Sequence, residues 1–259
     1  MSNIDNNESS SNEMTGKKIF FLYPTASVQS HVIAELVQHE YEVYIAKDHN
    51  RLARILKKYP DSIIYINIDE MNEAEYEKWI TSLLTALPSV KIGVFTSNTD
   101  EEFKNRLTSK FNISCGLLTL KIDMSKMNEK INAALNILNV KGRRKYIRAS
   151  TERESNTTMN MPFHGEYLNG TIKDISVVGI SCVFENDPDL SKNTLLKDIQ
   201  IRLQSILLKV EGVIFGSRES CGEKTYVMLF TQRIDPDVKV KIRKYIQQNL
   251  QAKMDNEIN

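Results

Sequence analysis

The stretch that decides the fold of the first half is "PDSIIYINIDE", residues 60–70. Its centre is apolar without alternation, which is typical of a strand buried on both faces. The next segment, "EAEYEKWITSLLTAL" (73–87), carries apolar residues at helical spacing. A doubly buried strand followed by an amphipathic helix indicates a parallel sheet with helices on both sides.

The same strand–helix unit recurs on either side of this stretch. Strands are predicted at 17–24, 41–47, 62–68, 90–96 and 114–120, and helices at 27–40, 48–60, 73–87, 100–111 and 125–140. Five such units predict a doubly wound α/β domain over 17–140, with strand order 2-1-3-4-5. Residues 1–16 are polar and acidic and lack the features of a signal peptide, so we expect a disordered tail.

The periodicity changes after residue 160. Further strands are predicted at 165–176, 179–185, 196–204, 205–219 and 223–232, with turn residues between them. A helix over 235–251 begins with Asp235-Pro236, a capping residue followed by proline. This pattern predicts an all-β domain over 164–259, in which a small six-stranded barrel precedes a C-terminal helix. The join, 141–163, is expected to be a linker in which 149–162 form a loop or one irregular edge strand.

Composition excludes several classes of function. The formal net charge of the 259 residues is only +1, so the protein as a whole is not expected to bind nucleic acid. Three cysteines without a framework fit a reducing cytoplasm, and each is interpreted as a small buried apolar residue. No apolar run approaches the ~18 residues of a membrane span. The histidines lack metal-ligand spacing, and no nucleophile–base arrangement or phosphate loop is present. We therefore predict a cytoplasmic protein that is not an enzyme and uses no metal or cofactor.

The predicted linker begins with "KGRRKYIRAS" (141–150), which has three arginines, two lysines and no acidic residue. Such crowded positive charge favours a bound anion. Arg144 and Arg148 point the same way on a helix or on an extended chain, and Arg143 directly precedes them. Guanidinium groups can bind phosphate in a bidentate manner, pair with the N7 and O6 atoms of guanine, or stack on a base.

A second candidate motif is "DISVVGIS" (174–181), at a tight joint between two predicted strands. The Asp174 carboxylate could accept hydrogen bonds from the N1 and N2 groups of a guanine, and Ser176 could bind a phosphate or a base edge. Gly179 permits a turn or a close approach of the backbone.

Together the two motifs resemble those of the PilZ family, bacterial domains that bind cyclic di-GMP. The family pattern is R-x-x-x-R in an N-terminal segment, followed by (D/N)-x-(S/A)-x-x-G at a strand end. The matching residues are Arg144, Arg148, Asp174, Ser176 and Gly179. The resemblance covers about 141–250. Each motif is weak alone: the basic segment could be a solvated basic helix end, and "DISVVG" could be an ordinary hairpin.

The resemblance implies a cyclic di-GMP receptor in which the arginines hold phosphates and guanine faces while the Asp-Ser-Gly corner contacts the other side. Family members with an extra arginine directly before the motif often bind two intercalated ligand molecules. Arg143 occupies that position, so the resemblance implies that two molecules could bind here. Because the motif lies at the join, we expect ligand binding to change the arrangement of the domains. The output would be an altered surface for an unidentified protein partner.

The first domain resembles the receiver domain of response regulators, with features missing. Ile66 or Asn67 stands nearest the place of the phosphorylated aspartate, and Asp69 follows two or three positions later. Residues 23–25, where a magnesium-binding acidic pair is expected, contain no carboxylate. Thr96 and Lys121 match the threonine and lysine of the family. We interpret the domain as a degenerate receiver used for docking or dimerisation.

Alternatives remain open at the level of sequence. The first domain could be an unrelated flavodoxin-like domain, or a working receiver that uses Asp69. The protein could then be a phosphorylation-responsive regulator. The basic linker could also bind nucleic acid or phosphate generically, with steep salt dependence and little preference for base.

Overall fold

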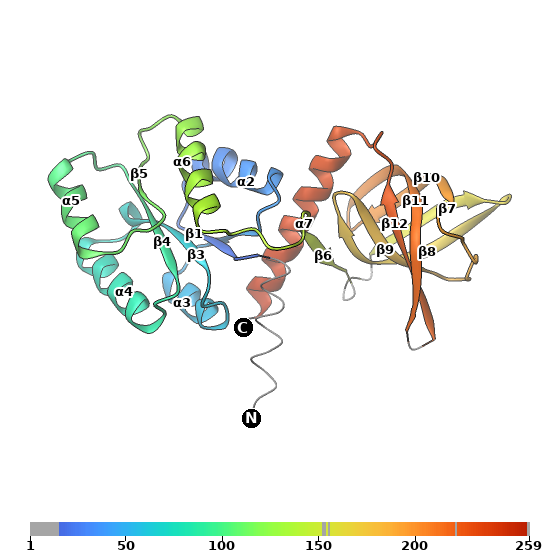
Figure 1. Ribbon diagram of the computed structural model, residues 1–259, viewed down its shortest axis with the longest axis horizontal. Coiled ribbons are helices and arrows are strands. Elements are labelled where there is room, and N and C mark those ends of the chain that lie inside the picture. Colours follow the sequence, from blue (N-terminus) through green and yellow to red (C-terminus); the bar gives the residue numbers. More distant parts are fainter. Residues whose placement is uncertain (1–15, 152–153, 155, 221, 258–259) are drawn as a thin grey trace, which may run out of the picture. The chain divides into compact units, whose positions relative to one another are not determined.

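A computed structural model describes residues 16–151, 154, 156–220 and 222–257. The chain divides into two compact units (Figure 1). The first comprises Met1–Lys145 together with Gln251–Asn259, and the second comprises Tyr146–Leu250. The division falls inside the predicted linker. The predicted tail lies outside the described residues except for Gly16, which forms an isolated antiparallel bridge with Lys141.

The first unit contains a five-stranded parallel sheet. Its strands are β1 (Ile19–Leu22), β2 (Val43–Ala46), β3 (Ile63–Asn67), β4 (Lys91–Thr96) and β5 (Leu117–Thr119). They lie in the order β2-β1-β3-β4-β5, which confirms the predicted doubly wound topology. All residues of β1 and β3 are buried, as the unbroken apolar runs predicted.

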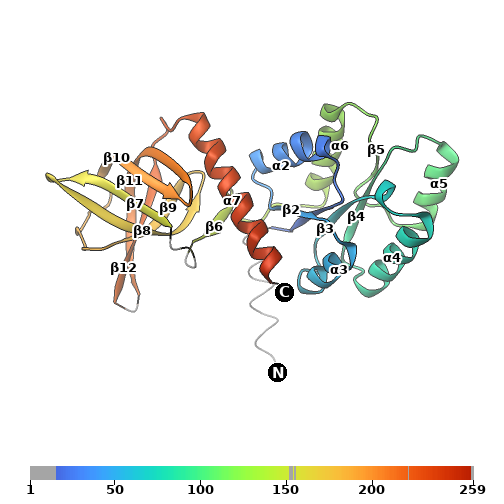
Figure 2. The same cartoon turned by 180° about the vertical axis from the view of Figure 1, so that it is seen from behind.

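Helices cover both faces of this sheet (Figures 1 and 2). They are η1 (Val28–Ile33), α2 (Ala34–Gln38), α3 (His49–Lys58), α4 (Glu73–Ala86), α5 (Glu101–Lys110) and α6 (Met124–Ile137). Val32 and Leu36 share one buried cluster with Ile131 and Leu135, so η1, α2 and α6 cover the same face. The single helix predicted for 27–40 is a π-helical turn that continues as an α-helix.

The second unit is a closed antiparallel barrel. Its strands are β7 (Thr157–Phe163), β8 (Glu166–Ser176), β9 (Gly179–Phe184), β10 (Leu195–Leu203), β11 (Ile206–Ser220) and β12 (Glu223–Phe230). They follow the order β8-β7-β10-β11-β12-β9, and the β8–β9 pairing closes the ring. A short strand, β6 (Arg148–Ser150), pairs with the end of β8 beyond the part that pairs with β7. The all-β prediction, with six strands in the barrel, is confirmed.

The prediction of a loop or an irregular edge strand at 149–162 is wrong, because β7 occupies most of the second half of this range. This strand pairs with β8 on one side and β10 on the other, so it is an inner strand of the barrel. Thr157, Met159 and Met161 alternate as buried residues along it. The alternation was not recognised because threonine, asparagine and methionine give weak contrast between the two faces of a strand.

A long helix, α7 (Pro236–Asn256), follows the barrel. Ile242, Tyr245 and Ile246 belong to the same buried cluster as the barrel strands. The Tyr245 hydroxyl donates to Glu154 Oε2 at 2.7 Å, and the Asn249 amide donates to the same carboxylate. The helix therefore packs on the barrel and also holds the connection between β6 and β7. None of the helices in the described residues combines the length and apolar character needed to cross a bilayer.

Two of the three cysteines lie in the described residues, and both are buried. Cys115 belongs to the core of the first unit, and Cys182 lies inside the barrel. Burial raises the pKa of the Cys115 thiol to about 11 and that of the Cys182 thiol to about 12. The interpretation of these two as buried apolar residues is confirmed, and Cys221 lies outside the described residues.

We expect iodoacetamide to leave Cys115 and Cys182 unmodified in the native protein at mildly alkaline pH. Both thiols are shielded from solvent and stay protonated because the pH lies below their raised pKa values. Peptide mass spectrometry measures the labelling, and the same reaction in concentrated urea should modify both. Fast labelling of either cysteine in the native protein would contradict the buried positions.

Candidate functional site

The corner between β8 and β9 is the structural centre of the candidate site. β8 ends at Ser176 and β9 begins at Gly179, with only Val177 and Val178 between them. The Ser176 hydroxyl donates to the Gly179 carbonyl at 3.2 Å and accepts from the Val178 N–H at 3.4 Å. Ser176 is buried, so its first role is to close this turn.

Asp174 lies just before the corner, beside an irregularity in the β8–β9 pairing between Ile172 and Asp174. Such a bulge re-aims the side chains of a strand. Oδ1 of Asp174 lies 3.5 Å from Nη1 of Arg148, and Oδ2 of Asp174 accepts a hydrogen bond from the Ser181 hydroxyl. The Asp174 side chain is 28% exposed, so this carboxylate can still be reached from solvent.

Arg148 is the first residue of β6 and pairs in register with Ser176. Its side chain is 48% exposed. Its Nη1 forms an ion pair with the Asp174 carboxylate, and a guanidinium group offers five N–H donors in all. The rest of the guanidinium fork can bind an anion without losing that contact.

Gly179 is required by the packing of the barrel itself. A Cβ atom at this position would lie 2.2 Å from the Met228 carbonyl oxygen and 3.1 Å from Cα of Leu229. Both neighbours are backbone atoms of β12, which pairs with β9. The close backbone approach predicted for this glycine is present, and the partner is the next strand.

Arg143 and Arg144 belong by contact to the first unit. Both are exposed, and residues 142–147 form neither helix nor strand. Arg144 makes no ion pair with the residues that the structure describes. The spacing of Arg144 and Arg148 predicted that both lie on one helix or one extended segment. In the structure they share neither a helix nor a strand. The structure brings together the other four predicted residues, Arg148, Asp174, Ser176 and Gly179.

Sequence reasoning did not single out Ser181. It is buried in β9 and donates to the carboxylate of Asp174, so it fixes one oxygen of that group. The available signal was its place two residues after Gly179, which puts both residues on the same face of the strand. The register of the β8–β9 pair places Ser181 opposite Asp174, which brings the hydroxyl to the carboxylate.

The predicted receiver residues lie at the carboxyl ends of the parallel strands. Asn67 is buried at the end of β3, and its amide donates to the Tyr23 carbonyl at 3.0 Å. Asp69 accepts from the Thr96 hydroxyl and from the Ser97 N–H, both at 2.7 Å. Both carboxylate oxygens of Asp69 are therefore engaged by β4 and the residue that follows it. No group of three or more acidic, histidine or cysteine side chains able to hold a metal occurs in the described part of the chain.

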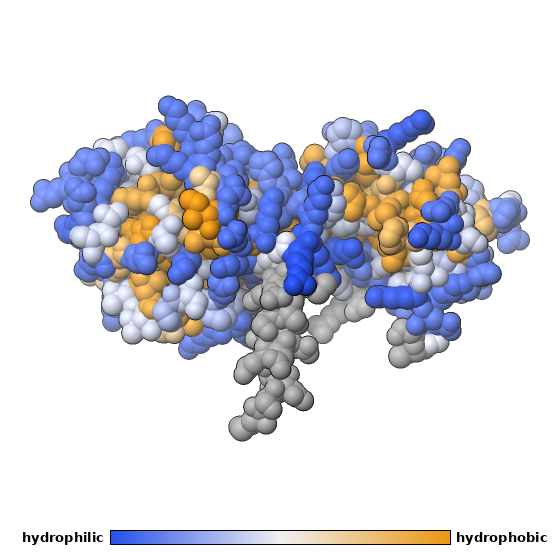
Figure 3. Space-filling view, viewed as in Figure 1, coloured by the Kyte–Doolittle hydropathy of each residue, from blue (hydrophilic) through white to orange (hydrophobic). Residues whose placement is uncertain are grey.

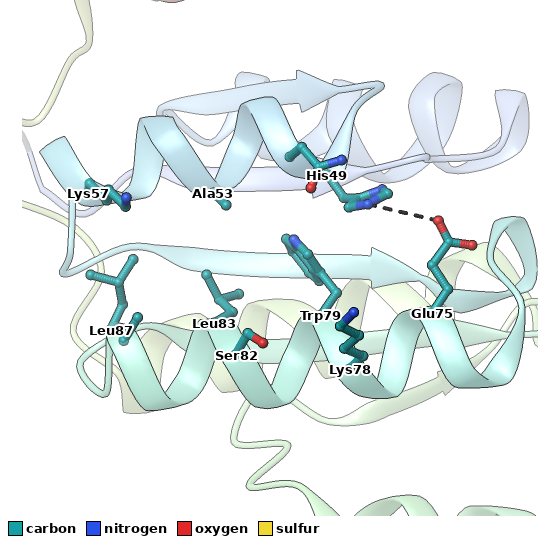
Figure 4. Close-up of a pocket in the computed structure, with 11 residues that line it drawn as sticks. His49, Ala53, Lys57, Glu75, Lys78, Trp79, Ser82, Leu83 and Leu87 are labelled. Atoms are coloured by element: carbon teal, nitrogen blue, oxygen red, sulfur yellow. Dashed lines mark ion pairs between the residues drawn. The ribbon is translucent and has the colours of Figure 1, made fainter.

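The first unit also carries a groove of about 440 Å³ between α3 and α4 (Figure 4). His49 lies edge-on to Trp79, with ring centroids 5.8 Å apart, and its Nε2 is 3.9 Å from Glu75 Oε1. Trp79 is 91% buried and counts among the core residues of the chain. Lys57 and Lys78 also line the groove. The groove thus combines basic, acidic and apolar side chains, and this combination does not indicate one class of ligand.

No protein-family model and no curated protein sequence matches the chain. Solved structures similar to it are PilZ domains and response-regulator receiver domains. The PilZ domain of YcgR from Escherichia coli, solved with c-di-GMP, has a TM-score of 0.39 and 16% identity, over 44% of this chain and 96% of that one. The MrkH–c-di-GMP complex of K. pneumonia has a TM-score of 0.39 and 21% identity, over 46% and 57%.

A response regulator from Thermotoga maritima has a TM-score of 0.41 and 12% identity, over 47% of this chain and 98% of that one. Each of these matches covers less than half of the chain. The chain spans about half the length of the full YcgR structure, 51%, and a little more of MrkH, 57%. The two kinds of domain are those that the sequence motifs resemble.

We expect Gly179→Ala to destabilise the second unit by about 1–3 kcal/mol, because the added methyl group collides with the backbone of β12. Hydrogen exchange of peptides from β9 and β12 measures the loss of protection. Gly216→Ala is the matched control, since a Cβ there meets no atom within 4 Å. Equal protection in both variants would show that Gly179 is not required by the strand packing.

Proposed function

We propose that the protein is a receptor for cyclic di-GMP, which binds at the β8–β9 corner. The observation that carries this proposal is the Arg148–Asp174 pair beside Ser176 and Gly179 on the barrel surface. It combines a guanidinium fork, a carboxylate and a serine-closed corner in the order and spacing that the PilZ motif has. The receptor requires no catalysis, metal or cofactor.

The chemistry of the corner suits a guanine nucleotide. Asp174 can accept hydrogen bonds from guanine N1–H and N2–H while it keeps Arg148 and Ser181, since a carboxylate offers about four lone-pair positions. The Arg148 guanidinium, which is 48% exposed, can donate to a phosphate or to guanine N7 and O6. Adenine lacks both the O6 acceptor and the N1–H donor, so the same corner disfavours adenine nucleotides.

Arg143 and Arg144 add the remaining charge in this proposal. Residues 141–150 carry five basic side chains and no acidic one, although the net charge of the whole protein is only +1. A dianionic ligand would neutralise this local excess and draw the segment toward the corner. Either one ligand molecule binds, or Arg143 contributes to an intercalated pair. The ordering of this segment would then change the arrangement of the two units and the surface presented to a protein partner.

Calorimetric titration with cyclic di-GMP tests the site. We expect Arg144→Ala, Arg148→Ala and Asp174→Ala each to weaken binding at least about fivefold, because each removes a charge-assisted contact worth roughly 1–3 kcal/mol. Arg218→Ala, at an exposed arginine of β11, is the matched control and should bind normally. Unchanged binding in the Arg148 and Asp174 variants would refute the site.

Competing nucleotides separate this proposal from its alternatives. GTP and cyclic di-AMP should bind more weakly than cyclic di-GMP. Steep salt dependence with equal affinity for all three would favour a generic phosphate binder. Acetyl-phosphate labelling of Asp69 would favour a phosphorylated receiver. Both Asp69 oxygens already accept hydrogen bonds, which disfavours phosphorylation at this residue.

Solution scattering tests the proposed rearrangement. Saturating cyclic di-GMP should change the radius of gyration and the interunit distance distribution of the wild-type protein, because the bound segment joins the two units. Arg144→Ala should need a higher nucleotide concentration than the wild type to reach the same change in profile, in proportion to its weaker binding. An identical profile for ligand-free and saturated wild type would remove rearrangement from the proposal and leave ligand binding intact.

A further inference from the structure

The register of the barrel strands places the candidate site in one row with apolar residues. Starting from the arginine, each residue pairs with the next across neighbouring strands: Arg148, Ser176, Gly179, Leu229, Val213 and Leu195. Residues paired directly across strands share one face of a sheet. The row therefore changes from polar to apolar at Gly179.

The apolar end of the row lies on the outside of the barrel. Leu229 is 39% exposed and Leu195 is 50% exposed, whereas Met228 and Ile214, adjacent along the strands, are fully buried in the barrel core. Phe215, at an irregularity of β11, is 57% exposed. Apolar side chains are visible on the face of the second unit drawn in Figure 3. We call Leu195, Val213, Phe215 and Leu229 the apolar shelf.

Strand spacing sets the distance between the shelf and the corner. Neighbouring strands lie ~4.8 Å apart, so Leu229 on β12 is two spacings, or about 10 Å, from Ser176 on β8. The residue between them in the row is Gly179, which has no side chain to stand above the surface. A ligand held at Arg148 and Asp174 therefore meets Leu229 as the next side chain along the row.

The faces of a guanine match this surface. A purine presents polar groups at its edges and flat, weakly hydrated faces, and burying those faces against apolar side chains is favourable. A cyclic dinucleotide is wider than one strand spacing. Contacts at the corner alone would leave one base face in water.

We propose that the apolar shelf is a base-binding subsite, in which Leu229 and Val213 contact a face of a guanine whose nucleotide is held at Arg148 and Asp174. This inference rests on the proposed function and extends it, because neither motif includes a β11 or β12 residue. The subsite takes a flat heteroaromatic ring and supplies affinity without selecting among bases. Selection of guanine stays with Asp174 and Arg148.

Leu207 offers a matched comparison on the same barrel. It is 74% exposed and is also a leucine of the β10–β11–β12 surface, yet it pairs with Arg202 at the far end of the β10–β11 ladder. Its register position is six residues along β11 from Val213. Leu207 therefore controls for the loss of an exposed leucine.

Calorimetry of the full chain with cyclic di-GMP tests the affinity. We expect Leu229→Gln to weaken binding about five- to tenfold, the effect of losing part of one leucine contact. Leu207→Gln should bind as the wild type does. Because Leu229 is a surface residue, circular dichroism should show both variants folded.

Methyl NMR of the full chain tests the contact itself. Ring currents from a guanine face should shift the Leu229 and Val213 methyl signals upfield on addition of cyclic di-GMP, while Leu207 stays unmoved. A purely structural role of Leu229 would not produce this shift.

Each outcome decides the inference. Weakened binding in Leu229→Gln with upfield methyl shifts supports the subsite. Wild-type affinity in that variant, or unshifted Leu229 and Val213 methyls in a protein that binds the nucleotide, overturns the subsite and leaves the proposed function standing. Absence of binding by the wild type overturns both.

Discussion

The pairing of β8 with β9 is the constraint on which the second unit depends. It closes the ring of strands and satisfies backbone groups that would otherwise form two open edges. Closure requires a tight corner, which the Ser176 hydroxyl holds, and a close approach to β12 that only glycine allows at position 179. Two residues that close the barrel, Ser176 and Gly179, thus also belong to the candidate site.

The charges at the β8–β9 corner act over a short range. Arg148 and Asp174 are partly exposed, so their ion pair contributes little to stability and serves mainly to orient both groups. Ser181 fixes the second carboxylate oxygen. An anionic guanine nucleotide would find donors and acceptors already arranged, so less ordering of side chains would oppose binding. The shelf adds an apolar surface, whose contribution does not fall with salt.

Much of the architecture could be predicted from the sequence because its signals are local. Buried runs such as 62–68 and amphipathic stretches such as 73–87 indicate strands and helices residue by residue, and the count of units suggests the strand order. β7 was missed because its alternating residues differ little in polarity. Ser181 was missed because only strand register places it opposite Asp174.

By itself, the sequence determined the two kinds of domain, the parallel order of the first sheet, and the chemical types in the two motifs. Those features follow from periodicity and composition within short windows. Tertiary structure alone decided that Arg148, Asp174 and Ser181 meet, that Gly179 faces the backbone of β12, and that Leu229 and Val213 continue the row. The physical reason is that strand pairing joins residues far apart in sequence through backbone hydrogen bonds, which carry no residue-specific signal.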